Sequence, residues 1–169
     1  MDDDILLLEG DLVFDEELLL DLCRSPHADA AVVDAYRPSM EGTVVLAEGG
    51  VATAMVLRSA QPPGFDYRAA LKTVNIHRLS RATVARHLLP ELDRFVMGGH
   101  TNEFYEAALA ELIAQGHLRL GVHLPGARRW AEIDTVDDLL EARRIFQPTV
   151  RPGDAVRASA AAATPGGPR

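Results

Sequence analysis

Apolar residues in this chain occur in short runs separated by amphipathic stretches, a pattern typical of an α/β domain. The run Ile5–Leu8 predicts a strand covered on both faces, and the leucines of residues 16–23 predict a helix after it. Residues 30–33 form a second apolar run. Because strand, helix and strand follow one another, we expect the two strands to form a parallel pair with a right-handed crossover.

The middle of the chain is richer in β-forming residues. Two β-rich runs within residues 43–57 flank a Gly-Gly turn and predict a hairpin. Proline and glycine at residues 61–66 predict a loop that could serve as a mobile flap. Residues 72–79 alternate as a strand does. The expected fold is therefore an α/β domain with a mixed, mostly parallel sheet flanked by helices.

Three more helices are predicted in the second half of the chain. Ser80 suits the N-cap of a helix that is broken or kinked near Pro90. A second helix is expected over residues 102–115, after a cap at Thr101. The third follows Thr135, and an acidic residue three positions later completes a capping-box pattern.

Length and composition favour one compact domain. The chain has 169 residues, and 47% of them are hydrophobic, enough for a real core. We expect a domain over residues 1–146. Residues 147–169 are rich in proline, glycine, alanine and arginine and have almost no large apolar side chain, so a disordered tail is predicted there.

Charge and cysteine content limit the classes of partner and the cellular compartment that fit this chain. A formal net charge of -8 argues against partners such as nucleic acid and anionic membranes, which call for a basic face. The single cysteine, Cys23, cannot form an internal disulfide and fits a reducing compartment. The acidic start and the four-residue apolar run after it are too short for a signal peptide or a membrane span. We therefore expect a cytoplasmic protein.

Two aspartates follow predicted strands in similar settings. Asp11 comes after a glycine at the end of the first strand, and Asp134 ends a short strand before a helix. Two carboxylates at the ends of neighbouring strands suit Mg²⁺, which prefers oxygen ligands and leaves room for water and phosphate. Taken singly, each aspartate is also explained as a turn or helix-capping residue. The hypothesis of a shared metal site requires the fold to bring them together.

Several segments, in this order along the chain, resemble the nucleotidyltransferases of glycosyltransferase-A-like fold, also called nucleotide-diphospho-sugar transferase-like. Within that group they are similar to the cytidylyltransferases that act on phosphocholine or 2-aminoethylphosphonate. The resemblance extends from about Asp4 to Phe146. The segments are Leu8-Glu9-Gly10-Asp11, Met40-Glu41-Gly42-Thr43-Val44-Val45, Lys72-Thr73-Val74-Asn75-Ile76, Asn102-Glu103-Phe104-Tyr105-Glu106 and Trp130 to Leu139.

The resemblance implies transfer of CMP from CTP to a phosphate or phosphonate oxygen, with release of pyrophosphate. It implies that Asp11 and Asp134 bind Mg²⁺ and that Lys72 acts as a cation for the phosphates. Asn75 would orient a substrate or a neighbouring loop, or would make an ordinary strand hydrogen bond. The remaining alternative for Lys72 is a solvated surface lysine.

The resemblance also implies a site for the acceptor. Carboxylates and ring faces can surround a cationic amine or trimethylammonium group. The alternative is that the aromatic residues belong to the core and the glutamates to the solvated surface. The residues assigned to substrate binding, besides Asn75, are Glu103, Tyr105, Glu106, Trp130 and Glu132.

One family feature is absent from the sequence. Members of the family carry a glycine-rich loop with Arg and Lys that holds the nucleotide phosphates, and no Gly-x-Gly-x-Arg segment precedes Asp11. We therefore expect an N-terminally truncated domain, which is either a truncated or mis-started gene product or one half of a split enzyme. Such a domain could be inactive alone, and could need an N-terminal half as a partner or form a homo-oligomer. The alternatives are a non-catalytic binding module and a sugar-1-phosphate nucleotidyltransferase.

Overall fold

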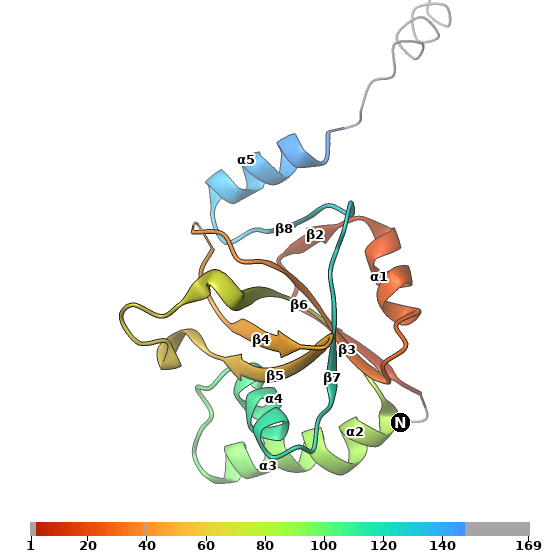
Figure 1. Cartoon of the computed structure of the whole chain (residues 1–169), viewed down its shortest axis with the longest axis vertical. Coiled ribbons are helices and arrows are strands. Elements are labelled where there is room, and N and C mark those ends of the chain that lie inside the picture. Colours follow the sequence, from red (N-terminus) through yellow and green to blue (C-terminus); the bar gives the residue numbers. More distant parts are fainter. Residues whose placement is uncertain (1–2, 39, 148–169) are drawn as a thin grey trace, which may run out of the picture.

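The computed structural model describes residues 3–38 and 40–147, and Figure 1 shows two sheets with helices on both sides. Apart from Gln147, the predicted tail lies outside the described residues. The strands are β1 (Ile5–Leu8), β2 (Leu12–Phe14), β3 (Asp29–Ala35), β4 (Val44–Glu48), β5 (Val51–Val56), β6 (Ala70–Leu79), β7 (Leu120–His123) and β8 (Trp130–Glu132). The helices are α1 (Glu16–Cys23), α2 (Arg81–Thr83), α3 (Leu89–Met97), α4 (Tyr105–Ala114) and α5 (Val136–Ile145).

The larger sheet has the strand order β1-β6-β3-β7-β5-β4, and β4 also pairs with β6. The expectation of a mixed sheet is confirmed. Among the described strands, only β3 and β7 pair in parallel, so parallel pairing is less extensive than the sequence indicated. The parallel pair expected between β1 and β3 does not form. These two strands do run in the same direction, but β6 lies between them and pairs antiparallel with both.

β1 is an edge strand of this sheet, and its two faces are only partly covered, which differs from the prediction of a strand covered on both faces. Only β6 borders it, and Leu6 is 42% exposed. Its other apolar side chains are half-buried: Ile5 and Leu7 pack against one hydrophobic cluster and Leu8 against another. A four-residue apolar run therefore does not by itself distinguish a central strand from an edge strand.

The two faces of the larger sheet are covered by different helices, because successive side chains of a strand point to opposite faces. In β3, Ala31 and Val33 pack into a cluster with α4, whereas Ala30 and Val32 pack against α1. Leu18 and Leu22 of α1 are fully buried, and each contributes about 1.5–3 kcal/mol to stability by leaving water. The sheet is thus the middle layer of the domain.

The helix predicted after Ser80 forms, and its irregularity lies near the expected proline. Ser80 accepts a hydrogen bond from the amide of Thr83 and caps α2. A π-helical segment, Val84–Leu88, then leads into α3, which has Pro90 in its first turn. Because proline has no N–H to donate, regular i to i−4 bonding cannot continue through this position, which explains the irregular turn.

The predicted loop over residues 61–66 forms, and contacts hold the residues at its two ends. The amide of the Gln61 side chain donates to the carbonyls of Gly42 at 2.8 Å and Val56 at 3.0 Å. The hydroxyl of Tyr67 donates to the Gln61 side chain, and its ring stacks on Tyr36 with 4.1 Å between ring centroids. Both ends of the loop are therefore held against the sheet.

The smaller sheet pairs β2 with β8, and α5 follows directly after β8 at one end of the domain (Figure 1). The predicted capping box at the start of α5 is confirmed: Thr135 accepts from the amide of Asp138, and the Asp138 carboxylate accepts from the amide of Thr135. Among the described helices, none is long and apolar enough to cross a membrane.

His77 should make stability depend on pH. It is fully buried in β6, and neither ring nitrogen has a hydrogen-bond partner within the described residues. Burial lowers the pKa of His77 to about 4, against about 6.5 in an unfolded chain. The unfolded state therefore binds an extra proton between these values, and stability falls as pH drops through this window. The loss reaches about 3 kcal/mol at 1.36 kcal/mol per pKa unit.

Urea unfolding of His77→Phe at pH 7, 5.5 and 4 tests this expectation. The wild-type protein should lose stability below pH 6.5 by an amount that the variant does not lose. His100→Gln, which changes an exposed histidine, should keep the wild-type pH dependence. An unchanged pH dependence in His77→Phe would show that His77 is not the titrating group.

Candidate active site

The pairing of β2 with β8 brings the two predicted metal-binding aspartates into one cleft. Leu12 lies opposite Glu132 in this pair, and the amide of Ile133 donates to the backbone carbonyl of Asp11 at 2.9 Å. Asp134 is the next residue after Ile133. Both aspartates are exposed and line a single cleft of about 1350 Å³. The structure therefore places both aspartates on the same cleft, and the metal site itself stays a prediction.

The cleft also contains most of the other predicted site residues. It lies between the end of β1, the first half of β6, strand β8, the first turn of α4 and one side of α5. Within the described part of the chain, Glu103 and Tyr105 are the two predicted residues that do not line it. Those that do, besides the aspartates, are Lys72, Asn75, Glu106, Trp130 and Glu132.

Lys72 is buried, in contrast to the alternative of a solvated lysine. It is 3% exposed, and its Nζ lies 3.4 Å from Oε2 of Glu132. A Cβ atom at Gly42 would come within 3.0 Å of the same Nζ, so the absence of a side chain at Gly42 leaves room for the ammonium. Lys72 is thus a fixed positive charge inside the cleft.

Three glutamates line the same part of the cleft as this lysine. Glu106 is 5% exposed in the first turn of α4. Burial raises the pKa of Glu106, the Thr43 hydroxyl opposes that shift, and Glu9 adds to it. Burial also raises the pKa of Glu132, whereas Lys72 lowers it. The inner cleft therefore carries more negative than positive charge.

Glu9 was missed by the sequence analysis. It lies two residues before Asp11, lines the cleft, and accepts a hydrogen bond of 2.6 Å from Nδ2 of Asn75. Its position next to Gly10-Asp11 was a possible signal, because the same turn that exposes Asp11 also brings the preceding residue to the end of β1. Only the contact with β6 shows that it faces inward.

Glu103 and Tyr105 lie outside the cleft for different reasons. The predicted helix over 102–115 begins only at Tyr105, with Phe104 at its N-cap, so Glu103 lies in the exposed turn before it. Tyr105 packs its ring edge against His77 at a centroid distance of 5.9 Å. Burial, followed by the charges of Glu9 and Glu106, raises the pKa of Tyr105, so it remains a neutral phenol.

Trp130 has a structural contact as well as a place in the cleft. Its indole N–H donates to Oδ2 of Asp34 at 2.9 Å, and its ring packs against the cluster beneath α1. Asp34 in turn accepts from Arg37 at 3.3 Å. The indole is therefore fixed, and its half-buried ring presents a rigid surface to the cleft.

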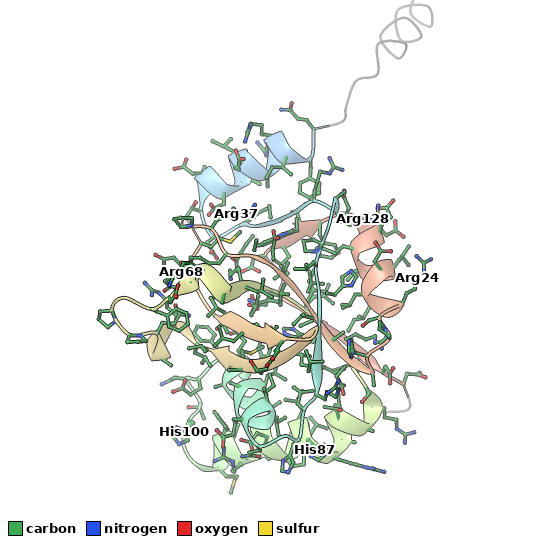
Figure 2. The ribbon with its side chains drawn as sticks, viewed as in Figure 1. Arg24, Arg37, Arg68, His87, His100 and Arg128 are labelled. Atoms are coloured by element: carbon green, nitrogen blue, oxygen red, sulfur yellow. The ribbon has the colours of Figure 1, made fainter. Side chains whose placement is uncertain are left out.

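Four arginines at the cleft were also missed by the sequence analysis. Arg37 and Arg128 are labelled in Figure 2. Arg128 pairs with Asp21 at 3.0 Å, and Arg129 pairs with Asp15 at 2.7 Å, which lowers the pKa of Asp15. The adjacent Arg128 and Arg129 after a Pro-Gly turn were the available signal. The four are Arg37, Arg58, Arg128 and Arg129.

The carboxylates do not form a closed metal cage. Within the described residues, no group of three or more His, Cys, Asp or Glu side chains is arranged to hold a metal ion. Asp11 and Asp134 are two exposed oxygen donors facing one cleft. This arrangement fits an ion that takes its remaining ligands from water and substrate phosphates, as Mg²⁺ usually does.

Comparison with known proteins defines the class of fold. The chain has the fold of the nucleotidyltransferases, and the resemblance noted in the sequence is confirmed. CTP:phosphocholine cytidylyltransferase from Streptococcus pneumoniae superimposes with a TM-score of 0.64 and 15% identity, over 84% of this chain and 57% of that one. Inositol-1-phosphate CTP transferase from T. maritima gives 0.56 and 14%, over 89% and 59%.

Comparison of sequences identifies a relative that is more similar to this chain in sequence than the two solved structures are. The chain is 34% identical over 152 residues to CMP-5'-(3-aminopropyl)phosphonate synthase from Streptomyces rubellomurinus. This match covers 88% of the chain but only 24% of that relative's length. No family model matches the chain. The chain therefore has the fold of these nucleotidyltransferases and is similar to one part of these longer proteins.

Proposed function

We propose that this domain takes part in Mg²⁺-dependent transfer of CMP from CTP to a small acceptor that carries a phosphonate or phosphate and an amine. The observation that carries the proposal is the convergence of Asp11, Asp134, Lys72 and Glu106 on one cleft. The cytidylyltransferases among the fold relatives and the aminopropylphosphonate named for the sequence relative support CTP and an aminoalkylphosphonate as substrates.

In the proposed reaction, an oxygen of the acceptor attacks the α-phosphorus of CTP. A new P–O bond forms, the bond between the α- and β-phosphates breaks, and pyrophosphate leaves with the electron pair. Asp11 and Asp134 would hold Mg²⁺, which supplies charge neutralisation and alignment of the reacting oxygens. Lys72 offers a fixed cation for a phosphoryl or phosphonyl oxygen. Positioning and charge stabilisation suffice, so no protein nucleophile is required.

The acceptor's amine would bind among the inner carboxylates. Glu9, Glu106 and Glu132 bring three carboxyl groups to the part of the cleft that contains Lys72, and burial disfavours that excess of negative charge. A bound ammonium would offset it. Trp130, fixed by its hydrogen bond to Asp34, provides an aromatic ring on the cleft wall to pack against the alkyl chain or the cation. Glu103 and Tyr105 have no part in this proposed subsite.

Binding of the nucleotide would require an additional protein segment. The chain spans 57% and 59% of the two solved relatives, and the sequence predicted a separate nucleotide-binding half. The rim arginines could meet the phosphates, but three of them already pair with aspartates. We therefore propose that a glycine-rich phosphate-binding segment, in the same polypeptide or a partner, completes the active site.

A reconstitution assay tests this function. Purified protein is incubated with CTP, Mg²⁺ and 3-aminopropylphosphonate, phosphocholine or inositol 1-phosphate, with and without the N-terminal half of the Streptomyces relative, and pyrophosphate is measured. Release that depends on both the added half and an amine-bearing acceptor is expected. Release only with inositol 1-phosphate would favour a sugar-phosphate-type acceptor. No release under any condition, with no binding of divalent ions or acceptor, would favour a non-catalytic module.

Glu106→Gln tests the amine subsite. Removing this charge should raise KM for 3-aminopropylphosphonate by about tenfold, because a hydrogen bond to a charged group contributes about 1.5–3 kcal/mol, and should leave KM for propylphosphonate nearly unchanged. Glu111→Gln, an exposed position on the same helix outside the cleft, is the control. An equal effect on both acceptors would argue that Glu106 does not bind the amine.

A further inference from the structure

Asn75 has an unusual backbone conformation in the middle of β6. Its φ is 57°, and it is the only non-glycine with positive φ among the described residues. Most L-residues avoid this region, whereas asparagine tolerates it better than most. Such a conformation inside a strand, 5% exposed and beside a cleft, is held by its surroundings at an energetic cost.

The strand bulges at this residue. Along β3 the pairing advances by two residues, from Ala31 to Val33, while along β6 it advances by four, from His77 to Thr73. Asn75 is one of the β6 residues between Thr73 and His77 that have no partner in β3. A bulge of this kind redirects side chains and backbone groups at the end of a sheet. Here it turns the Asn75 side chain toward the end of β1.

Hydrogen bonds connect the bulge to β1. Thr73 Oγ1 donates to Oδ1 of Asn75 at 2.5 Å, and Nδ2 of Asn75 donates to Oε2 of Glu9 at 2.6 Å. The backbone amide of Glu9 donates to the carbonyl of Asn75 at 3.3 Å. Both the oxygen and the nitrogen of the Asn75 side-chain amide therefore have a hydrogen-bond partner. Glu9 is bound to Asn75 through both its backbone amide and its carboxylate.

This connection reaches the proposed metal site. Glu9, Gly10 and Asp11 form the turn that leaves β1, and no atom of the described residues, apart from Gly10 and its two chain neighbours, lies within 4 Å of a Cβ built at Gly10. The turn is therefore open at Gly10, and hydrogen bonds hold its two ends. Asn75 holds the first end, and the Ile133 amide, donating to the Asp11 carbonyl, holds the second.

We infer that Asn75 is a positioning residue: its left-handed bulge and the Thr73–Asn75–Glu9 hydrogen bonds fix the turn that presents Asp11 to Asp134. This inference rests on the proposed function for the role of the two aspartates. The contact itself does not depend on a metal. Asparagine suits the position because it combines tolerance of positive φ with an amide donor, whereas glycine supplies only the first property.

Amide hydrogen exchange measures the contact directly. Asn75→Gly keeps the backbone conformation accessible and removes the side chain. Protection of the Glu9 and Ile133 amides should fall about tenfold, because a hydrogen bond to a charged group contributes about 1.5–3 kcal/mol and 1.4 kcal/mol is tenfold. Val32 and Val33 in β3 serve as internal references for global destabilisation. Asn102→Gly changes the chain's other asparagine, which is exposed, and should leave all four amides unchanged.

A second pair of variants approaches the contact from β1. Glu9→Ala should reproduce the loss of protection, and combining it with Asn75→Gly should add little, because both changes remove the same link. Glu9→Gln keeps an oxygen acceptor but loses the charge, so it should lose less protection than Glu9→Ala. Independent, additive losses from the two single variants would overturn the inference, as would wild-type protection in Asn75→Gly.

Titration with Mn²⁺, followed by electron paramagnetic resonance, then links the turn to metal binding. Asn75→Gly should bind Mn²⁺ about tenfold more weakly than the wild-type protein. Equal affinities would overturn the positioning role while leaving the metal site intact. Failure of the wild-type protein to bind Mn²⁺ would instead contradict the proposed metal site, and the exchange data would still decide whether Asn75 holds the turn.

Discussion

Replacing Asp11 or Asp134 by asparagine is expected to reduce CMP transfer by on the order of 10³-fold in the reconstituted enzyme. A bound metal supplies several kcal/mol of transition-state stabilisation, and each 1.36 kcal/mol is a factor of ten in rate. An asparagine keeps the size of the side chain but removes the charge that attracts a divalent cation. Both aspartates are exposed, so stability should change little.

Metal binding provides a readout that does not depend on reconstitution. The wild-type chain should bind Mn²⁺, each single variant should bind it more weakly, and Asp11→Asn/Asp134→Asn should show no binding in the same concentration range. Asp93→Asn, an exposed aspartate on α3 outside the cleft, is the matched control and should match the wild-type protein. Removal of metal with EDTA should abolish transfer, and Mg²⁺ should restore it. Full activity of either single variant would contradict the shared-metal hypothesis.

Replacing Lys72 by methionine is expected to destabilise the fold by about 3 kcal/mol at neutral pH. The lysine side chain is 4% exposed and that of Glu132 is 27% exposed. Removing one partner of a buried ion pair leaves the other charge uncompensated, at a cost of about 3–5 kcal/mol; the partial exposure of Glu132 favours the lower end of that range. Lys72 also lowers the pKa of Glu106, so two carboxyl groups lose a stabilising neighbour.

The pH dependence of this effect has a definite sign. Without Lys72, the pKa values of Glu106 and Glu132 should rise further above their unfolded values. The folded state then binds more protons than the unfolded state between those values, so stability falls as pH rises through the folded pKa. Urea unfolding should therefore show a smaller penalty for Lys72→Met at pH 5 than at pH 8.

Two further variants isolate the ion pair. The double variant Lys72→Met/Glu132→Gln also removes the uncompensated charge of Glu132 and should recover part of the lost stability. Arg144→Met breaks the exposed pair with Glu141 on α5 and should cost less than about 1 kcal/mol. If Lys72→Met were no more destabilising than Arg144→Met, Lys72 would not be a buried structural charge.

Local elements were largely predictable because they depend on nearby residues. The capping box of Thr135 and Asp138, the N-cap at Ser80 and the helix of buried leucines in α1 each follow from spacing within one or two turns. The start of α4 was misplaced because Thr101 looked like a cap, whereas the chain enters the helix at Tyr105. The prediction therefore placed Glu103 in a helix, whereas in the structure it lies in an exposed turn.

The candidate site was predictable only in part. Asp11 and Asp134 were found from the residues around each strand end, and Lys72, Glu106 and Trp130 from the family resemblance. Glu9 and the rim arginines have no distinctive local pattern, because the role of each depends on which strand or helix faces it. Tyr105 was expected at the substrate and instead packs on His77.

The amino-acid sequence by itself determined which segments form strands and helices, the acidic charge and the carboxylates available for a metal, because periodicity, capping and residue chemistry act over a few neighbouring positions. Only the tertiary structure decided that β6 separates β1 from β3 and that Lys72 is buried. It likewise decided that Asn75 holds the turn before Asp11. Those features depend on pairing between residues far apart in the chain, and backbone hydrogen bonds can be satisfied by more than one strand order.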